Sequence, residues 1–361
     1  MRVVILLVLT AVLILPAGAA GQGQRGPAAA PCVPQGPNGV QFVCDQTAPE
    51  DLVLVPGGNW IVATSFGGSG GIRIINIKDK KSTLAYPKEG AKEQLDKKTY
   101  DTCPGPPDAA QKAMFTTHGL ALREGRNSVH TVYVVNHGKR ESIEVFQLDA
   151  KVNPPALTWI GCVVAPDPIG LNEVLPLADG GFIGTDFLAR GDNAARARMS
   201  AGEVNGALWQ WHTGKGWEKI PGSEASGANG LEISKDGKTL YVAGWGNQTF
   251  FKMSLGQTPV KREDIKLSFR PDNVRLSLDG SVLFAAGHTD KDGRSIVEPR
   301  EPLRETSNVA RIDPKTLEFR RIFQHAAMDG FVATTTGIQI GNELWLGSQR
   351  GDRIAFLPMP K

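Results

Sequence analysis

The sequence contains few cysteines, and their spacing excludes the usual zinc sites. Only four occur in 361 residues. None belongs to a C-x-x-C pair of the kind found in structural zinc sites. The complete G-x-x-x-x-G-K-[ST] pattern of a phosphate-binding loop is also missing. These absences argue against zinc-finger folds and P-loop nucleotide enzymes.

The chain also lacks concentrated charge. Its formal net charge is +3, and its 40 Lys and Arg residues are scattered, without a cluster that contains aromatic side chains. Nucleic-acid-binding domains usually carry such a basic patch. We therefore expect no nucleic-acid partner. Because 41% of the residues are hydrophobic and 21% are charged, a globular core is expected.

Long apolar runs are missing except at the N-terminus. There, Met1-Arg2 is a short positive start, residues 3–15 are apolar, and Pro16 precedes small residues that run to Ala20. The run is short for a membrane span and has the flank of a cleavage site, so residues 1–20 are interpreted as a signal peptide. An uncleaved membrane anchor is the alternative. Cleavage would leave a secreted or periplasmic protein with no stable membrane span.

Export permits disulfides. Four cysteines allow three pairings, and the sequence does not choose between them. Cys32 and Cys44 lie close together among Pro and Gly residues, so a local disulfide loop is preferred. Residues 21–45 are rich in Gly, Pro, Ala and Gln and are expected to form a flexible lead-in. The folded domain is expected to span residues 46–361.

Beyond the lead-in, helical periodicity is rare and short apolar runs alternate with turn signals. Six hairpin-like units recur, each with a Gly- or Asp-Gly-type turn. They start at Asp51, His118, Asn172, Asn229, Asn273 and Thr336, at intervals of 44 to 67 residues. This spacing predicts an all-β, six-bladed β-propeller with four-stranded blades. A β-sandwich or two smaller β domains would not explain six similar units.

The innermost strands of a propeller run along its axis, so the residues that start them should meet at one mouth of the channel. Ca²⁺ takes six to eight oxygen ligands, often carboxylates and amide carbonyls. Such oxygens are offered by Glu50, Asn172, Asn229, Asp272 and Asn273. Each residue alone is more simply a turn or capping residue. Their shared position in successive hairpins predicts a central calcium ion.

His118 and His137 lie at opposite ends of one predicted hairpin and are placed to touch. A histidine with a pKa near neutrality can act as a general base, and a second one can orient it. A structural, hydrogen-bonded role is the alternative. Asp186 and His288 are expected at the same mouth as pocket residues. No serine opens a hairpin, where a strained nucleophile would sit.

At these residues the chain resembles the paraoxonase/arylesterase family. It also resembles the wider group of senescence-marker protein-30, gluconolactonases and strictosidine-synthase-like propellers. The resemblance covers most of the mature chain. It is carried by the segments PEDLVLVPGG, HGLAL, VYVVNHGKRESIEVFQL, LNEV, ANGLEISKDGKTLYVAG and PDNVRLSLDG.

The resemblance implies a six-bladed propeller with two calcium ions in its tunnel. The catalytic ion would be held by the five oxygen donors named above. The structural ion would be held by Asp51, the backbone carbonyl of Leu120, and Glu173. His118 and His137 match the family's histidine dyad.

Three features depart from the family. The family more often has Asp where Glu173 stands. Its disulfide between the N-terminal region and the last blade cannot form, because no cysteine follows Cys162, so ring closure must depend on strand pairing. Residues 187–206 are rich in Arg and Ala, and residues 289–304 are highly charged. Because such loops wall the pocket, the family's substrate range does not carry over.

These observations predict a calcium-dependent hydrolase of lactones or aryl esters, with a small-molecule substrate. His118, oriented by His137, would deprotonate the attacking water, and Asp272 is the alternative base. A second hypothesis is a non-catalytic propeller that binds a ligand or a partner. Carbon–carbon bond formation, as in strictosidine synthase, is a third and less favoured one. The sequence does not predict the oligomeric state.

Overall fold

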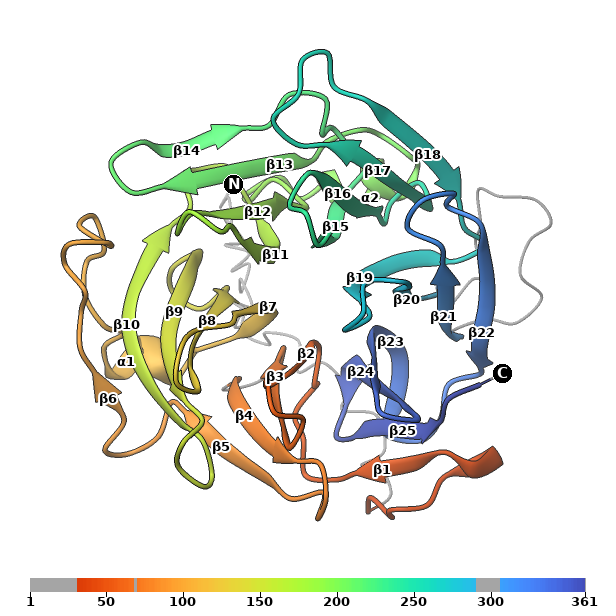
Figure 1. Cartoon of the computed structure of the whole chain (residues 1–361), viewed down its shortest axis with the longest axis horizontal. Coiled ribbons are helices and arrows are strands. Elements are labelled where there is room, and N and C mark those ends of the chain that lie inside the picture. The colour runs from red at the N-terminus through yellow and green to blue at the C-terminus, as the bar shows by residue number, and fades with distance from the viewer. Residues whose placement is uncertain (1–30, 68–69, 290–305, 361) are drawn as a thin grey trace, which may run out of the picture.

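The computed structural model describes residues 31–67, 70–289 and 306–360, and its strands form six sheets around a central axis (Figure 1). The prediction of an all-β, six-bladed propeller is therefore confirmed. The expected signal peptide, residues 21–30 of the expected lead-in and residues 290–304 of the charged loop lie outside the described part of the chain.

Each blade places one strand next to the axis. These innermost strands contact those of both neighbouring blades. In chain order they are β2 (Leu52–Leu54), β7 (Thr117–Arg123), β11 (Leu171–Pro176), β15 (Ala228–Ile233), β19 (Arg270–Leu276) and β23 (Phe331–Ile340).

The other strands of each blade follow outward from the axis. The second strands are β3 (Trp60–Ser65), β8 (Val129–Asn136), β12 (Phe182–Asp186), β16 (Thr239–Gly244), β20 (Leu283–His288) and β24 (Glu343–Gly351). The third strands are β4 (Gly71–Asn76), β9 (Ser142–Asp149), β13 (Ala207–His212), β17 (Thr249–Ser254), β21 (Ser307–Ile312) and β25 (Ile354–Pro358). The fourth strands are β5 (Ser82–Tyr86), β10 (Ala156–Val164), β14 (Gly216–Lys219), β18 (Arg262–Lys266), β22 (Phe319–His325) and β1 (Gln41–Val43).

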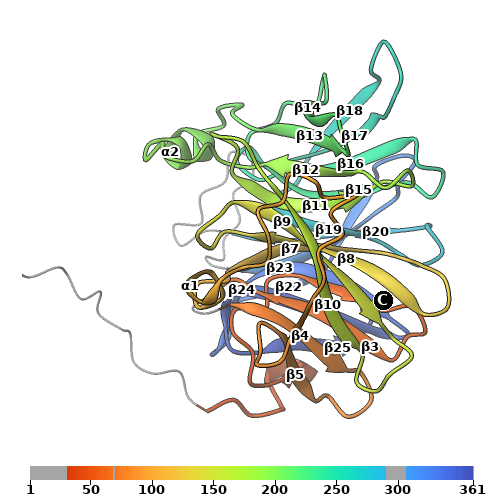
Figure 2. The ribbon, with the colours of Figure 1, turned by 90° about the vertical axis from the view of Figure 1, so that its left-hand side faces the viewer.

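The second blade departs from the expected four strands. A fifth, β6 (Lys92–Glu93), pairs in parallel with β10 at the outer edge of this blade. Two short helices lie in the loops between strands, α1 (Ala109–Lys112) and α2 (Ala195–Ser200), and a 3₁₀ turn, η1 (Pro37–Gly39), precedes β1. Figure 2 shows both helices on the same side of the propeller. Among the described residues, no helix has the length and apolar character needed to cross a membrane.

The last blade is completed by the N-terminal part of the chain. Strand β1 pairs antiparallel with β25. Strand pairing therefore closes the ring, as predicted from the absence of a late cysteine. Phe42 and Val43 are buried as part of this pairing, with exposed fractions of 5% and 2%. Residues 41–43 thus belong to the propeller and not to the flexible lead-in, because Phe42 and Val43 pack on the last blade.

All four cysteines are paired. Cys32 and Cys44 form the local disulfide preferred from the sequence. The second disulfide joins Cys103, in the loop before α1, to Cys162 of β10. Paired cysteines are typical of proteins in oxidising compartments, in agreement with an extracytoplasmic location.

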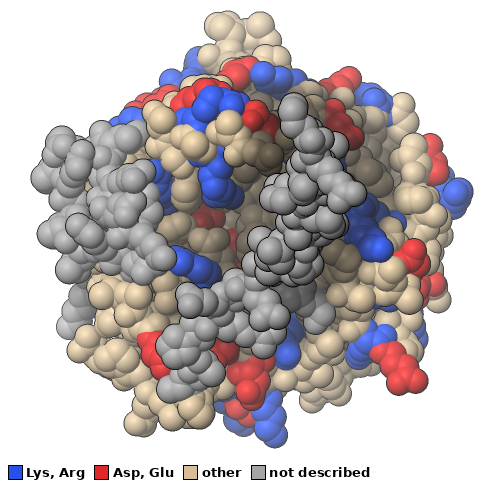
Figure 3. Space-filling model, turned by 180° about the vertical axis from the view of Figure 1, so that it is seen from behind, with Lys and Arg blue, Asp and Glu red and all other residues tan. Residues whose placement is uncertain are grey.

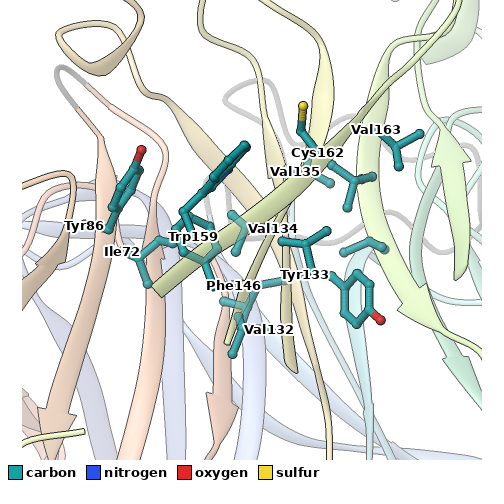
Figure 4. Packing of buried hydrophobic residues seen from close by; sticks show 14 of the residues in the cluster. Ile72, Tyr86, Val132, Tyr133, Val134, Val135, Phe146, Trp159, Cys162 and Val163 are labelled. Carbon is teal, nitrogen blue, oxygen red and sulfur yellow. The ribbon is translucent and has the colours of Figure 1, made fainter. Parts of the chain in front are cut away.

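Apolar side chains fill the space between the blades. Figure 4 shows the cluster between the first and second blades, where Trp159 of β10 and Phe146 of β9 lie near Ile72 and Tyr86. Trp159 is fully buried. Replacing a buried tryptophan by alanine typically costs about 3–5 kcal/mol. Such packing stabilises the contact between neighbouring blades.

In five of the six blades, the innermost strand pair loses regular register at the same place. The shifts lie between residues 117 and 120, 171 and 174, 228 and 231, 271 and 274, and 334 and 337. A β-bulge leaves residues outside the ladder, re-aims their side chains and often lies beside an active site. The residues between these limits include His118, Asn172, Asn229, Asp272 and Thr336. The local pattern repeated in the sequence is therefore a repeated bulge.

Candidate functional site

The structure brings the predicted oxygen donors together from four blades. Asn273 Nδ2 donates a hydrogen bond to Glu50 Oε1 at 2.9 Å. Asn229 is hydrogen bonded to Asp272. Asn172 Nδ2 lies 3.4 Å from His118 Nε2, and that nitrogen lies 3.7 Å from Glu50 Oε1. All five donor side chains are almost completely buried, with exposed fractions of 0% to 4%.

Several oxygens in this cluster have no hydrogen-bond partner. A buried polar atom without a partner costs about 1–3 kcal/mol, and native proteins contain few of them. Here four buried acceptors share one neighbourhood. They are Glu50 Oε2, Asn172 Oδ1, Asn229 Oδ1 and Asn273 Oδ1. Such a group of unsatisfied oxygens fits a hard cation such as Ca²⁺, which binds oxygen ligands.

Burial disfavours the negative charge of the two carboxylates in this cluster. It raises the pKa of Glu50 well above its usual value, and the neighbouring carboxylates of Asp51 and Asp272 raise it further. Burial also raises the pKa of Asp272 to about 8. A divalent cation would offset both effects and balance the two charges. The described residues hold no cluster of three or more His, Cys, Asp or Glu side chains suited to a metal, so an ion here depends on the three asparagine amides.

Two glycines allow the ligand-bearing strands to approach each other. A Cβ atom on Gly230 would lie 2.3 Å from the carbonyl oxygen of Asp272. A Cβ atom on Gly119 would lie 2.4 Å from the carbonyl oxygen of Asn172. Only glycine permits contacts this close. Gly119 and Gly230 therefore set the spacing between neighbouring blades. They follow His118 and Asn229 in the sequence.

Three side chains form a hydrogen-bonded relay beside the oxygen cluster. His118 Nδ1 lies 2.8 Å from His137 Nε2. His137 Nδ1 lies 3.0 Å from both carboxylate oxygens of Glu141. Because a carboxylate accepts, His137 Nδ1 carries the proton, and its Nε2 accepts from His118 Nδ1. His118 Nε2 then carries a lone pair, which accepts a long hydrogen bond from Asn172 Nδ2 at 3.4 Å and lies 3.7 Å from Glu50 Oε1.

The surroundings keep His118 neutral and fixed. Burial, with smaller effects of His137 and Arg196, lowers the pKa of His118 well below its usual value. The ring of Phe66 packs 4.3 Å from the His118 ring and covers it. Glu141 is itself held by the backbone N–H of Leu171, which donates to Oε1 at 2.7 Å. The lone pair of this neutral, oriented imidazole is available to accept a proton, and the lowered pKa makes it a weaker base than a free histidine.

Of the two predicted pocket residues, His288 lies beside the oxygen cluster, and Asp186 lies where burial and the charge of Glu141 raise its pKa. His288 Nδ1 is 3.7 Å from Asp272 Oδ2, and burial lowers the pKa of His288 to about 4. The ring of His288 lies 5.9 Å from that of Trp245, which also lies beneath Arg196 of α2. Asp186 accepts a hydrogen bond from the N–H of residue 170 at 3.2 Å, and burial raises its pKa to about 6. Figure 3 shows the face that carries α2, with a central hollow and Lys and Arg side chains at its edge.

The residues expected to hold a second ion also converge, but around an arginine. Arg275 Nη1 donates to Glu173 Oε2 at 3.1 Å, and Nη2 donates to the Leu120 carbonyl at 3.0 Å. Nη2 also donates to Asp51 Oδ2. The guanidinium group thus contacts every one of the three expected ligands. These residues do not offer the open oxygen cradle seen around Glu50.

Glu141 and Arg275 were not identified from the sequence. Glu141 stands opposite His137 across the β8–β9 turn, because Asn136 and Ser142 are paired in register. A prediction of this strand pairing would have placed Glu141 beside His137. Arg275 lies two residues after Asn273 on β19, and side chains two apart share one face of a strand. Its place on the axis-facing side of an innermost strand would have identified Arg275 as a tunnel residue.

No protein-family model and no curated protein sequence matches the chain. Solved structures do. A gluconolactonase from Xanthomonas campestris is 15% identical, with a TM-score of 0.55 over 89% of each chain. A luciferin-regenerating enzyme is 13% identical, with a TM-score of 0.56 over 88% of this chain and 94% of that chain.

A third solved structure is a calcium-binding regucalcin from Agrobacterium tumefaciens. It is 13% identical, with a TM-score of 0.53 over 89% of this chain and 94% of that chain. Identities this low establish the fold alone. In fold, the chain is a gluconolactonase- and regucalcin-like six-bladed propeller.

Proposed function

We propose that the protein is a calcium-dependent hydrolase of lactones or aryl esters, of the paraoxonase type. One observation carries the proposal: four buried, unpartnered oxygens stand beside the lone pair of a neutral histidine. The oxygens suit a cation, and the lone pair suits a proton acceptor. A carbonyl compound attacked by water needs both functions. The lactonase and calcium-binding names of structural neighbours agree with this assignment.

The metal would be held by Glu50, Asn172, Asn229, Asp272 and Asn273. A bound Ca²⁺ supplies positive charge that favours the negative charge developing on a carbonyl oxygen. The two carboxylates of this set neutralise the free ion. The three neutral amides complete the set without adding further negative charge.

The relay prepares a water molecule for attack. His118 Nε2 accepts a proton from the water as its oxygen forms a bond with the carbonyl carbon. His137 holds the required tautomer of His118 by accepting from Nδ1, and Glu141 holds His137 by accepting from its Nδ1. The proton on His118 is then available to the leaving oxygen of the ester or lactone. Phe66 limits the access of bulk water to this ring.

A lactone panel and phenyl acetate test the proposal, each assayed with calcium and with EDTA. We expect turnover with calcium, loss with EDTA and recovery when calcium is restored. His118→Gln should lower kcat by roughly 10²–10⁴-fold, the usual contribution of a general base. His212→Gln, which alters a histidine paired with Asp179 on the outer part of blade three, should leave activity unchanged.

Two outcomes would redirect the assignment. Absence of turnover on every substrate, with calcium bound, would contradict the hydrolase and favour a ligand-binding propeller. Turnover that survives in His118→Gln would instead move the role of base to Asp272. Asp272 lies within the same cluster, and burial raises its pKa to about 8.

A further inference from the structure

The side chain of Arg275 crosses the tunnel one layer beyond the proposed calcium site. It extends from β19 in the fifth blade and is 12% exposed. Its partners lie on the first, second and third blades. Nε is 3.5 Å from the Leu52 carbonyl, Nη2 is 3.0 Å from the Leu120 carbonyl, and Nη1 is 3.1 Å from Glu173 Oε2.

The carboxylates around this arginine have no unused oxygen. Asp51 Oδ1 accepts from the Leu52 N–H at 2.8 Å. Asp51 Oδ2 accepts from the Leu120 N–H at 2.9 Å and from Arg275. Glu173 Oε1 accepts from the Val174 N–H at 2.9 Å, and Oε2 accepts from Arg275. The proposed calcium site differs in this respect, because four of its oxygens lack partners.

The same position cannot hold both a guanidinium and a calcium ion. Calcium requires six to eight oxygens at 2.3–2.6 Å. Here Arg275 occupies the space between the oxygens of Asp51, Leu120 and Glu173. Arginine remains positively charged in proteins, so an added cation would also meet repulsion. The two calcium ions implied by the family resemblance therefore do not fit these residues.

We infer that Arg275 replaces the second cation of the tunnel and that the chain binds one calcium ion. The guanidinium supplies the positive charge that compensates Asp51 and Glu173. Its hydrogen bonds also link four blades. Without the arginine, ligand bonds to a metal would have to make this link. The inference does not require that the protein hydrolyses esters.

Arg275 also separates the proposed calcium site from one mouth of the tunnel. Arg275 lines a cavity of about 450 Å³ that also contacts Val53, Leu120, Glu232 and Lys235. This cavity lies at the end of the innermost strands, away from His118 at their start. Arg275 therefore stands between the proposed calcium site and the opposite mouth of the tunnel.

The bound calcium of the purified protein tests the inference directly. Calcium is removed with EDTA, restored by dialysis and counted by mass spectrometry of the metal, with isothermal titration as an independent count. We expect one ion per chain. Two ions per chain would overturn the inference. A count of zero would contradict the single ion of this inference and would also overturn the calcium site proposed above.

Arg275→Met tests the exchange between arginine and metal. The variant removes the positive charge and frees oxygens of Asp51, Leu120 and Glu173. We expect it to bind one more calcium ion than the wild type and to gain more thermal stability from added calcium. Arg126→Met, in the exposed β7–β8 turn, is the matched control and should behave as the wild type.

Failure of Arg275→Met to bind an additional ion would count against the exchange. If Arg275→Met does not fold without calcium, refolding it in calcium and in EDTA keeps the test decisive. Recovery that depends on calcium supports the inference, and failure in both solutions counts against it. The wild-type count requires no variant and stands independently.

Discussion

The tunnel contains two neighbouring clusters of buried polar groups that differ in how they are satisfied. Around Glu50 and Asn273, four acceptor oxygens have no partner. Around Asp51 and Glu173, every carboxylate oxygen accepts a hydrogen bond, and Arg275 supplies the positive charge. The two clusters are built from residues adjacent in the chain, such as Glu50 with Asp51 before β2 and Asn172 with Glu173 in β11.

The difference separates a binding site from a structural centre. Unpartnered buried oxygens are costly, so their presence in a group indicates that a ligand completes them. A buried ion pair with all its hydrogen bonds made is already complete, and removing one partner is strongly destabilising. Residue type alone would assign calcium to both clusters. The pattern of hydrogen bonds supports our proposal of calcium at only one of them.

The largest effect is expected from breaking the arginine-centred cluster. Arg275→Met leaves the carboxylates of Asp51 and Glu173 buried without a counter-charge. In EDTA we expect the free energy of unfolding to fall by about 3–5 kcal/mol, measured by urea denaturation. Arg126→Met should change it by less than about 0.5 kcal/mol. An equal, small change in both variants would contradict the structural role of Arg275.

Breaking the oxygen cluster should affect binding more than folding. Glu50→Gln removes one of two carboxylates that face the proposed ion. We expect calcium affinity to fall by about 2–5 kcal/mol, the range for truncating a buried charge pair, with little loss of stability in EDTA. Titration calorimetry measures the affinity, with Glu124→Gln in the exposed β7–β8 turn as control. Unchanged calcium affinity would remove Glu50 from the site.

A smaller effect is expected from a substitution in the relay of His118, His137 and Glu141, and this effect should be on kcat alone. Glu141→Gln weakens the support of His137 without touching the proposed calcium ligands. Because partners of this kind typically contribute 10–100-fold, we expect kcat to fall by about that factor while calcium affinity is unchanged. Steady-state kinetics and calcium titration on the same preparation provide the two readings. A matched fall in calcium affinity would show that Glu141 acts on the fold and not on the relay.

The fold was predictable because each blade repeats the same local sequence pattern. The turn after each short apolar run, and the polar residue before it, were visible at six positions. The absence of a cysteine after Cys162 also predicted closure by strand pairing. The short strand β1 was missed, because its three residues lie in a Gly- and Pro-rich segment and become buried only against β25.

The site was only partly predictable. The residues in the bulges could be aligned by position, so the convergence of the oxygen donors with His118 was predicted. Glu141 required the register of the β8–β9 hairpin. Arg275 required knowledge of which blades face each other, since it contacts residues 102 to 224 positions away in the chain. Local patterns carry no information about such distant partners.

Anomalous diffraction from crystals soaked in Tb³⁺, a heavier substitute for calcium, would test both clusters at once. We predict one strong peak within ligand distance of Glu50, Asn172, Asn229, Asp272 and Asn273, with the Arg275 guanidinium still bound to Asp51 and Glu173. A peak between Asp51 and Glu173, or no peak beside Glu50, would contradict the assignment of one cluster to metal and the other to arginine.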